Sequence, residues 1–411
     1  MNATLPTAEA LRAALAGLLD GLPSKQAAQA VERLIVNYRG ATPTDAPVLR
    51  DRSDVAAYAA YRMPATFEAV RAALEGLADA APAWVPGSHV DVGGGTGAAV
   101  WAAEAVWADG PPETADGEGG AGDGERDAGD EQGAGREGGD GQAAGAAGDG
   151  GEGQPGGRGG RATTVLDWAE PALALGRELA AASGARAVRA ADWRQARIGA
   201  ALKLPESDLV TVSYVLKELT ERDRAALVTE AARSAQAVVV VEPGTPDGYL
   251  RIMEARDRLI AAGLRIAAPC PHSGACPIER GMDWCHFAAR VSRSSLHRQV
   301  KGGSLPYEDE KFSYVAAVRF GTRPSGAGSS GARLSGAARP VPARVVRKPQ
   351  IRKGQVLLDL CTEDEGLRRE TVTKRHGPLY RAARDTDWGD AWPPPGGPEA
   401  TGGDGGPEAT G

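Results

Sequence analysis

Residues 89–97 read His-Val-Asp-Val-Gly-Gly-Gly-Thr-Gly, a short apolar run that leads into glycines and then into an alanine-rich stretch, 98–107. Gly93, Gly95 and Gly97 let the backbone turn sharply and approach a ligand closely at the start of a helix. A glycine-rich loop alone is weak evidence for a nucleotide-type site, but here a strand is expected before it and a helix after it. The stretch therefore predicts a strand–loop–helix unit with a binding site at its turn.

The same alternation continues downstream, where short apolar runs are each followed by a helical stretch. The expected strands are 89–92, 163–166, 208–213 and 237–241, and the expected helices are 98–107, 171–183, 222–236 and 249–263. Such repetition is typical of a parallel, doubly wound sheet with helices on both faces. We therefore predict an α/β domain over 81–267, preceded by a helical N-terminal region over 1–80 whose second helix pauses at Pro64.

Two segments differ in composition from the rest of the chain. Residues 110–160 are almost entirely Gly, Ala, Asp and Glu, and residues 385–411 are rich in Pro, Gly and acids. Neither segment can bury enough apolar surface to offset the entropy of ordering, so we predict an acidic disordered insert and a disordered tail. The insert carries 13 acids against 3 bases over 109–158, and the tail carries 6 acids and no base. The net charge of −7 therefore hides a remainder of about +9.

Beyond Lys311 the pattern becomes strand-rich, with expected strands at 312–320, 355–361 and 367–374. We assign 301–384 to a C-terminal region that is antiparallel or barrel-like. Its part 333–384 holds 13 Lys and Arg against 5 Asp and Glu. This excess favours a polyanionic partner, and a merely solvated basic face is the alternative.

The chain has four cysteines, three of which lie close together in a Cys-rich segment, 268–300. These three are Cys270, Cys276 and Cys285, and the fourth, Cys361, ends an expected strand. A chain this poor in cysteine, with no signal peptide recognised, has little reason to gather thiols for disulfides. Four thiolates suit a zinc ion or a [4Fe–4S] cluster, and the residues alone do not separate the two. The alternative is two buried thiols and two placed by chance.

Two carboxylates are expected to contact the same ligand as the glycine loop. Asp167 ends the second expected strand, where it can accept hydrogen bonds from ribose hydroxyls, and Asp192 is expected near the end of a following strand, where it would contact an adenine. The pattern resembles the class I S-adenosylmethionine-dependent methyltransferases, with Asp167 as the second motif. The first motif of that family maps onto Asp91, Gly93, Gly95 and Gly97. A dinucleotide site is the alternative, because its Gly-x-Gly-x-x-Gly spacing tolerates alanine at position 98, and a sheet that has lost its ligand is another.

No residue set suited to methyl transfer follows the fourth expected strand. Residues 213–219 read Ser-Tyr-Val-Leu-Lys-Glu-Leu. This stretch lacks the Asn/Asp-Pro-Pro-aromatic motif of amino-methylating enzymes and the nucleophilic cysteine of enzymes that attack pyrimidine C5. We therefore assign no catalytic residue and leave open whether the chain is an enzyme.

Longer stretches resemble the methyltransferase-like protein family of the mitochondrial small ribosomal subunit (Rsm-type assembly factors) and their bacterial relatives. The matching stretches are 57–66, 91–97, 241–246, 269–272, 283–287, 307–314, 377–384 and 388–390. The resemblance implies a class I methyltransferase fold, bound S-adenosylmethionine, and a role in assembling the small ribosomal subunit in contact with its RNA. It also implies a [4Fe–4S] cluster whose ligands map onto Cys270, Cys276, Cys285 and Cys361.

On this resemblance, the basic C-terminal region would contact phosphates. The residues expected to do so are Arg344, Arg347, Lys348, Arg352, Lys353, Lys374 and Arg375. We expect a cytoplasmic protein whose partners are small-subunit RNA and assembly intermediates. No membrane partner is expected, because no apolar stretch reaches the length of a membrane span. DNA is not expected as a partner either. Two alternatives remain, an active RNA methyltransferase without a recognisable catalytic signature and a redox or metal sensor with an iron–sulfur or zinc centre.

Overall fold

The structure is a computed structural model that describes residues 7–18, 52–108, 161–295, 304–319, 341–364 and 366–394, with isolated residues at 28, 29, 31, 32, 298 and 397. The expected acidic insert lies outside the described residues, as does most of the expected tail. In the part that is described, no helix is both long and apolar enough to cross a membrane.

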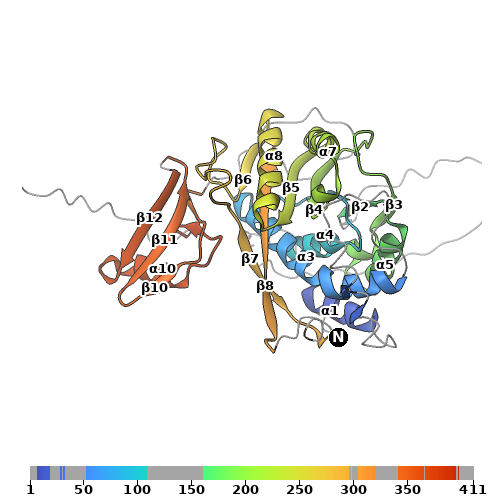
Figure 1. Cartoon of the computed structure of the whole chain (residues 1–411), viewed down its shortest axis with the longest axis horizontal. Coiled ribbons are helices and arrows are strands. Elements are labelled where there is room, and N and C mark those ends of the chain that lie inside the picture. Colours follow the sequence, from blue (N-terminus) through green and yellow to red (C-terminus); the bar gives the residue numbers. More distant parts are fainter. Residues whose placement is uncertain are drawn as a thin grey trace, which may run out of the picture. The chain divides into compact units, whose positions relative to one another are not determined.

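A large sheet of eight strands forms the main part of the molecule (Figure 1). Its strands are β1 (Ser88–Val92), β2 (Ala162–Asp167), β3 (Asp192–Gln195), β4 (Ser207–Ser213), β5 (Ala235–Pro243), β6 (Arg265–Ala268), β7 (Phe287–Ser292) and β8 (Tyr307–Val318). The helices that accompany it are α1 (Thr7–Leu18), α3 (Arg52–Ala80), α4 (Ala98–Trp107), α5 (Glu170–Ala181), α6 (Arg186–Arg189), the 3₁₀ helix η1 (Leu216–Glu218), α7 (Glu221–Ser234) and α8 (Pro246–Ala261).

The strand order is β3-β2-β1-β4-β5-β8-β6, and β7 pairs with the free first half of β8. The first five strands pair in parallel, whereas β8 runs antiparallel between β5 and β6. This arrangement confirms the predicted doubly wound α/β sheet and makes it a mixed one.

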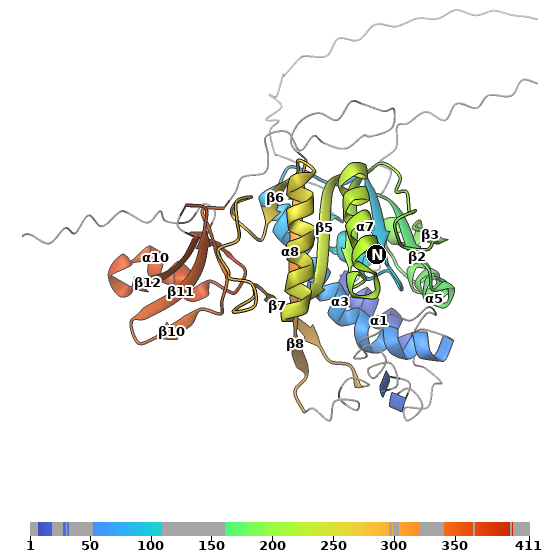
Figure 2. The ribbon, with the colours of Figure 1, turned by 45° about the horizontal axis from the view of Figure 1, so that its top comes forward.

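Both faces of the large sheet are covered, and β5 shows why. Alternate residues of its valine run point to opposite sides, as the period of a strand requires. Val239 and Val241 face a core layer shared with α1, α3, α4 and α5, and Val238 and Val240 face a second layer shared with α7 and α8 (Figure 2). A strand buried on both faces reads as a continuous apolar run, which is the signal that the sequence carried.

Helix α3 runs without interruption through Pro64, so the predicted pause there is wrong. Proline removes one backbone hydrogen bond from a helix interior and strains the preceding turn. Met63 and Phe67, on either side of it, are each 2% exposed in the same core layer. Apolar packing on both sides of the proline therefore holds the helix together.

A second sheet of five antiparallel strands forms the C-terminal region. Its elements are β9 (Ala343–Val345), β10 (Gln350–Arg352), β11 (Gln355–Thr362), β12 (Gly366–Thr373), the 3₁₀ helix η2 (Lys374–His376), α10 (Pro378–Asp385) and β13 (Ala391–Trp392). Strand β11 pairs with β12 along one edge and with β10 and β9 along the other. One face of this sheet packs on Leu379 and Ala383 of α10 around a small apolar core. The expected strands at 355–361 and 367–374 are thereby confirmed.

The boundaries of the predicted C-terminal region need two corrections. The expected strand 312–320 is β8, which belongs to the large sheet because residues 313–318 are buried between β5 and β6. The ordered chain also continues past the predicted end at 384. Trp392 of β13 is 2% exposed in the small core, and its indole Nε1 donates to Glu370 Oε1 at 3.1 Å.

Candidate cofactor loop and metal centre

The glycine loop follows β1 directly and ends where α4 begins, as predicted. Gly93, Gly95 and Gly97 all adopt positive φ angles, of 71°, 53° and 85°. Residues with a Cβ rarely adopt such angles. At Gly93 a Cβ would also lie 2.7 Å from the side chain of Val215. The loop therefore requires glycine for its backbone conformation and for close packing.

Asp91 lies in the strand just before the loop and is 1% exposed. Its Oδ1 accepts a hydrogen bond from the Thr211 hydroxyl at 2.7 Å, and that hydroxyl lies 2.8 Å from Nε2 of the buried His89. Its Oδ2 is buried and has no hydrogen-bond partner among the described residues. Burial raises the pKa of Asp91 to about 7, with a smaller contribution from the charge of Asp167. An unpartnered buried carboxylate oxygen next to the loop is suited to accept a hydrogen bond from a cationic ligand.

Asp167, at the end of β2, lies beside the loop because β1 and β2 run parallel and in register. Its Oδ2 accepts the Gly95 N–H and its Oδ1 accepts the Ala169 N–H, both at 2.9 Å. Burial raises the pKa of its carboxyl group. The structure thus brings Asp91, Asp167 and the glycines together at one edge of the sheet, as the sequence predicted.

Asp192 does not join this group, and its prediction is corrected. Strand β3 begins at Asp192 instead of ending there, and the residue pairs with Thr164 at the opposite end of the strand from Asp167. Its side chain is half-exposed and forms an ion pair with Arg194 at 2.6 Å. The residue level with Asp167 is Gln195, whose Nε2 donates to Trp168 O at 2.9 Å.

The loop residues fit S-adenosylmethionine as a ligand. That molecule carries an ammonium group and ribose hydroxyls, which match the free oxygen of Asp91 and the carboxylate of Asp167. When bound, it would supply an electrophilic methyl group. The residues of this chain would bind the ligand through the loop and the two carboxylates.

Tyr214, directly after β4, takes part in a network that the sequence analysis did not identify. Tyr214 has a φ of 59°, which is strained for a residue with a side chain. Its hydroxyl donates to Glu310 Oε1 at 3.1 Å. Arg62 donates to both oxygens of Glu310, at 2.9 and 2.6 Å, and its guanidinium lies 4.9 Å from the centre of the Tyr214 ring. Arg62 and Glu310 both fall in stretches of the family resemblance, which was the only sequence signal for them.

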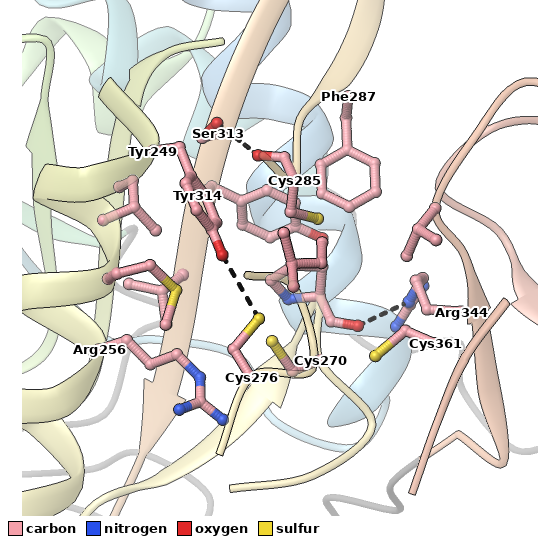
Figure 3. A pocket seen from close by; sticks show the side chains of 16 residues that line it. Tyr249, Arg256, Cys270, Cys276, Cys285, Phe287, Ser313, Tyr314, Arg344 and Cys361 are labelled. Atoms are coloured by element: carbon pink, nitrogen blue, oxygen red, sulfur yellow. Dashed lines mark hydrogen bonds between the residues drawn. The ribbon is translucent and has the colours of Figure 1, made fainter. Parts of the chain in front are cut away.

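The four cysteines line one pocket, although they come from distant parts of the chain (Figure 3). Cys270 and Cys276 lie in the loop after β6, Cys285 precedes β7, and Cys361 is on β11 of the second sheet. None of them forms a disulfide. All four cysteines therefore border one pocket, which is lined by residues of both sheets.

Hydrogen bonds to backbone carbonyls hold the cysteine-bearing segments in place. Arg256 of α8 donates through Nη2 to the carbonyl oxygens of His272 and Gly274, at 3.1 and 2.6 Å. Ser313 Oγ donates to the carbonyl of Cys285 at 2.7 Å. The Tyr249 hydroxyl lies 3.4 Å from Sγ of Cys276 (Figure 3). Helix α8 and strand β8 thus position three of the four thiols.

The pocket disfavours thiolates unless a cation is bound. Burial raises the pKa of Cys270, raises that of Cys285 well above its ordinary value, and raises that of Cys361 to about 12, with neighbouring thiolates adding repulsion in each case. A bound metal reverses this preference, because coordinating thiols are deprotonated. Among the described residues, however, no three or more His, Cys, Asp or Glu side chains converge closely enough to hold one metal ion. The thiols therefore border a space instead of meeting at a single point.

The histidines near the cysteines have other neighbours. His272 Nε2 lies 3.8 Å from Sγ of Cys361. His286 stacks on Trp284 with ring centres 5.3 Å apart and meets Trp388 edge-on at 4.8 Å. His286 thus packs between two tryptophan rings.

The predicted phosphate-contacting residues fall into three groups. Arg344 is 4% exposed, and its guanidinium donates to the carbonyls of Pro269 and Gly389, so its assignment as a surface contact is wrong. Its place opposite Cys361 in the β9–β11 pairing turns its side chain towards the pocket. Arg347 forms an ion pair with Asp283. The exposed members of the set are Lys348, Arg352, Lys353, Lys374 and Arg375.

Most of the chain matches a known family model. The model for the mitochondrial small ribosomal subunit protein Rsm22 matches residues 52–115 and 158–393. The human ribosome assembly protein METTL17, mitochondrial, is 26% identical over 354 residues, which cover 82% of this chain and 62% of that protein. The Rsm22-cox11 tandem protein 2, mitochondrial, of Schizosaccharomyces pombe is 32% identical over 182 residues, which cover 38% of this chain and 24% of that protein. The chain thus spans about a quarter of the yeast relative and less than two thirds of the human one.

Solved methyltransferases have a weaker likeness to the structure. Magnesium protoporphyrin IX methyltransferase from Synechocystis is 12% identical, with a TM-score of 0.33, and the alignment covers 70% of this chain and 93% of that one. A TehB-like methyltransferase from Corynebacterium glutamicum is 10% identical, with a TM-score of 0.27, over 56% of this chain and 79% of that one. Such scores say nothing about activity, and the strand order itself assigns the class I methyltransferase fold.

Proposed function

The chain belongs to the Rsm22 family, and from that premise we propose that it is an assembly factor of the small ribosomal subunit that holds a [4Fe–4S] cluster, binds S-adenosylmethionine and contacts ribosomal RNA. The observation that carries this proposal is the meeting of all four cysteines of the chain at one pocket. The four thiols come from three separate stretches and form no disulfide. A shared ligand explains why they lie at one pocket.

A cluster and a single zinc ion require different arrangements of the four thiols. Zinc draws its four sulfur ligands to one point, with bonds of about 2.3 Å. In a [4Fe–4S] cluster each thiolate binds a different iron atom, so the sulfur atoms stand further apart around a larger body. All four cysteines line one pocket, and the metal content of the purified protein distinguishes the two groups.

The cluster would join the two sheets of the protein. Three of its ligands, Cys270, Cys276 and Cys285, lie between strands of the large sheet, and Cys361 belongs to the second sheet. Binding free energy at such a site contributes directly to folding free energy. The cluster would therefore fix the second sheet, with its exposed cations, against the methyltransferase-like domain.

RNA binding is assigned to a smaller set than the sequence suggested. Lys353, Lys374 and Arg375 are exposed, and the side chain of Lys374 passes within 4 Å of the position of a Cβ on Gly354. Strand pairing sets Arg352 opposite Gln355, at the same turn between β10 and β11. These cations gather at one end of the second sheet, where they can contact phosphates and release counterions.

One purification tests the cluster and the RNA partner together. We expect anaerobically captured protein to be brown, to contain iron and sulfide, and to carry small-subunit RNA. Reversal of charge at Arg352, Lys353 and Lys374 should weaken RNA binding and flatten its dependence on salt, whereas reversal at the paired Arg369 should not. A colourless protein that contains zinc would contradict the iron–sulfur cluster. Unchanged RNA affinity in the charge-reversal variant would place the RNA-binding surface elsewhere.

Methyl transfer to RNA is the second candidate function, and Tyr214 is the observation that favours it. Strained backbone is often found at active sites. Tyr214 has such a backbone, and its hydroxyl donates to Glu310, which pairs with Arg62. Its neighbour Val215 packs against Gly93 of the glycine loop. Transfer of labelled methyl groups to immature small-subunit RNA, abolished by Asp91→Ala, would establish an enzyme. The absence of incorporation with bound S-adenosylmethionine would leave a binding role. The cytoplasmic location expected from the sequence is part of the proposal, and cell fractionation tests it.

A further inference from the structure

Two buried arginines face the four-cysteine pocket from opposite sides. Arg256 of α8 is 3% exposed and Arg344 of β9 is 4% exposed, and both line the pocket (Figure 3). A guanidinium stays charged in a protein under all ordinary conditions. Burying such a charge is costly unless an opposite charge or a set of hydrogen bonds compensates it.

The neighbouring carboxylates compensate these two charges only weakly. Arg256 Nη1 lies 3.9 Å from Asp257 Oδ1, but Asp257 is half-exposed and pairs with Arg280 at 2.8 Å. Asp79, exposed on α3, is within electrostatic range of Arg344 and is not hydrogen-bonded to it. Apart from an interaction of Arg256 with the Cys270 thiol, the hydrogen bonds of both arginines within the described chain go to neutral backbone carbonyls.

Each arginine also keeps one buried nitrogen free. Nε of Arg256 and Nη2 of Arg344 have no hydrogen-bond partner among the described residues. Unsatisfied buried donors are rare in folded proteins and call for an acceptor that is missing. Both arginines interact electrostatically with the Cys270 thiol. Both guanidiniums therefore face the space that the thiols border.

A metal centre with four thiolates would supply both the charge and the acceptors. A zinc ion or an oxidised [4Fe–4S] core carries a charge of about +2, which leaves the centre with four thiolates at about −2. Two guanidiniums balance that charge. Thiolate sulfur accepts N–H hydrogen bonds, and such bonds tune the reduction potential of iron–sulfur centres.

We propose that Arg256 and Arg344 are the counter-ions of the four-cysteine centre and that they raise the reduction potential of a cluster bound there. This inference rests on the proposed function, because it needs an iron–sulfur cluster at the pocket. One electron from a chemical reductant such as dithionite would take the centre from a charge of about −2 to about −3. Nearby positive charges stabilise the more negative form, so they make the reduction easier.

The two arginines are positioning residues as well. Arg344 Nε donates to the carbonyl of Pro269 at 3.0 Å, one residue before Cys270, and Arg344 itself pairs with Cys361 across β9 and β11. Arg256 holds the loop between Cys270 and Cys276 by two carbonyls. Charge and position are separable, because lysine keeps the charge without the planar fork of donors.

A redox titration of the full-length, anaerobically reconstituted protein tests the proposal. We expect Arg256→Gln and Arg344→Gln each to lower the ratio of reduced to oxidised cluster about tenfold at a fixed potential, a shift of about 59 mV for one electron. Arg256→Lys should keep the ratio near that of the wild type and still release iron to a chelator faster. Arg258→Gln, which removes an exposed charge from the same helix, is the matched control and should change neither property.

The outcomes separate the inference from the function beneath it. If the wild type binds a cluster and both glutamine variants have the same reduction potential as the wild type, the counter-ion role is wrong and the proposed function stands. Wild-type protein that binds no iron would overturn the proposed function and this inference together. Circular dichroism reports whether each variant folds, and if Arg344→Gln does not fold, Arg256→Gln and Arg256→Lys decide the question alone.

Discussion

The glycine loop and the cysteine pocket differ in how far apart in the chain their parts lie. The loop is one continuous stretch, residues 93–97, whose shape is set by its own backbone and by contacts with Val215 and Asp167. The pocket brings together Cys270 and Cys361, which lie 91 positions apart in the sequence, and its buried donors include some without an acceptor among the described residues. A local site of this kind keeps its shape without its ligand, whereas the pocket depends on what it binds.

The largest expected effect is therefore at the pocket. Cys361→Ser should remove a ligand of the cluster and lower the free energy of unfolding by several kcal/mol, because metal binding contributes directly to folding. Thermal unfolding and limited proteolysis of the second sheet measure the effect. Thr371→Ser, on the same sheet and exposed, is the control. After the metal has been removed, Cys361→Ser and the wild type should unfold alike, and a difference that persists would assign the loss to packing.

The glycine loop should respond to a backbone change whether or not a ligand is present. Gly93→Ala should cost about 2–4 kcal/mol, because it adds strain at a positive φ and a contact with Val215 at 2.7 Å. Gly263→Ala separates these two causes, since Gly263 has a φ of 85° but open space around it, and it should cost only about 1 kcal/mol. Chemical denaturation of both variants gives the comparison. Equal costs would show that packing against Val215 adds nothing.

Cofactor affinity should depend on pH through Asp91. Its pKa of about 7 means that the carboxylate is charged above that pH and protonated below it. Affinity for the cationic S-adenosylmethionine should therefore fall as the pH drops below 7, by up to about tenfold per pH unit. Calorimetry at several pH values measures this, and Asp91→Asn should give weak binding with a flat profile. A flat wild-type profile would place the ligand's positive charge away from Asp91.

When no ligand is bound, ionisation of Asp91 lowers the stability of the folded protein. The folded-state pKa of about 7 lies above the ordinary value of 3.8, so the folded protein holds the proton more tightly. Without the cofactor, the free energy of unfolding should decrease as the pH rises from about 4 to about 7. Denaturation of Asp91→Asn, which cannot ionise, should lack this contribution.

The smallest expected effect concerns the network beside the loop. Tyr214→Phe removes the hydroxyl that donates to Glu310, and it should cost about 1 kcal/mol because Glu310 keeps both bonds from Arg62. Tyr307→Phe, an exposed change on the strand that carries Glu310, is the control. A loss of methyl transfer in Tyr214→Phe with stability almost unchanged would favour the enzymatic function. Unchanged stability and binding would leave Tyr214 without a role.

The parts of the fold that could be predicted are those in which neighbouring residues decide the structure. The valine run of β5 and the glycines at 93–97 each have a local pattern with one structural meaning. The errors arose where distant residues decide. Asp192 begins a strand because of its pairing with β2, Pro64 stays helical because of packing on both sides, and β8 joins the large sheet because β5 offers it an open edge.

The candidate site shows the same limit. The four cysteines stood out because they are rare, and that rarity was the reason to expect them at one site. Arg344 was placed with the surface cations, because a basic segment does not show which of its charges is buried. Arg256 carried no signal at all, since one arginine on an amphipathic helix looks like any other. Only the fold reveals that both face the thiols.

The central claim is that the four cysteines hold one iron–sulfur cluster, and anomalous X-ray diffraction from crystals of the anaerobically purified protein tests it most directly. We expect a strong signal at the iron absorption edge, enclosed by the sulfur atoms of Cys270, Cys276, Cys285 and Cys361, and lost in Cys361→Ser. A signal that appears only at the zinc edge, or a pocket that shows no anomalous scatterer at either edge, would contradict it.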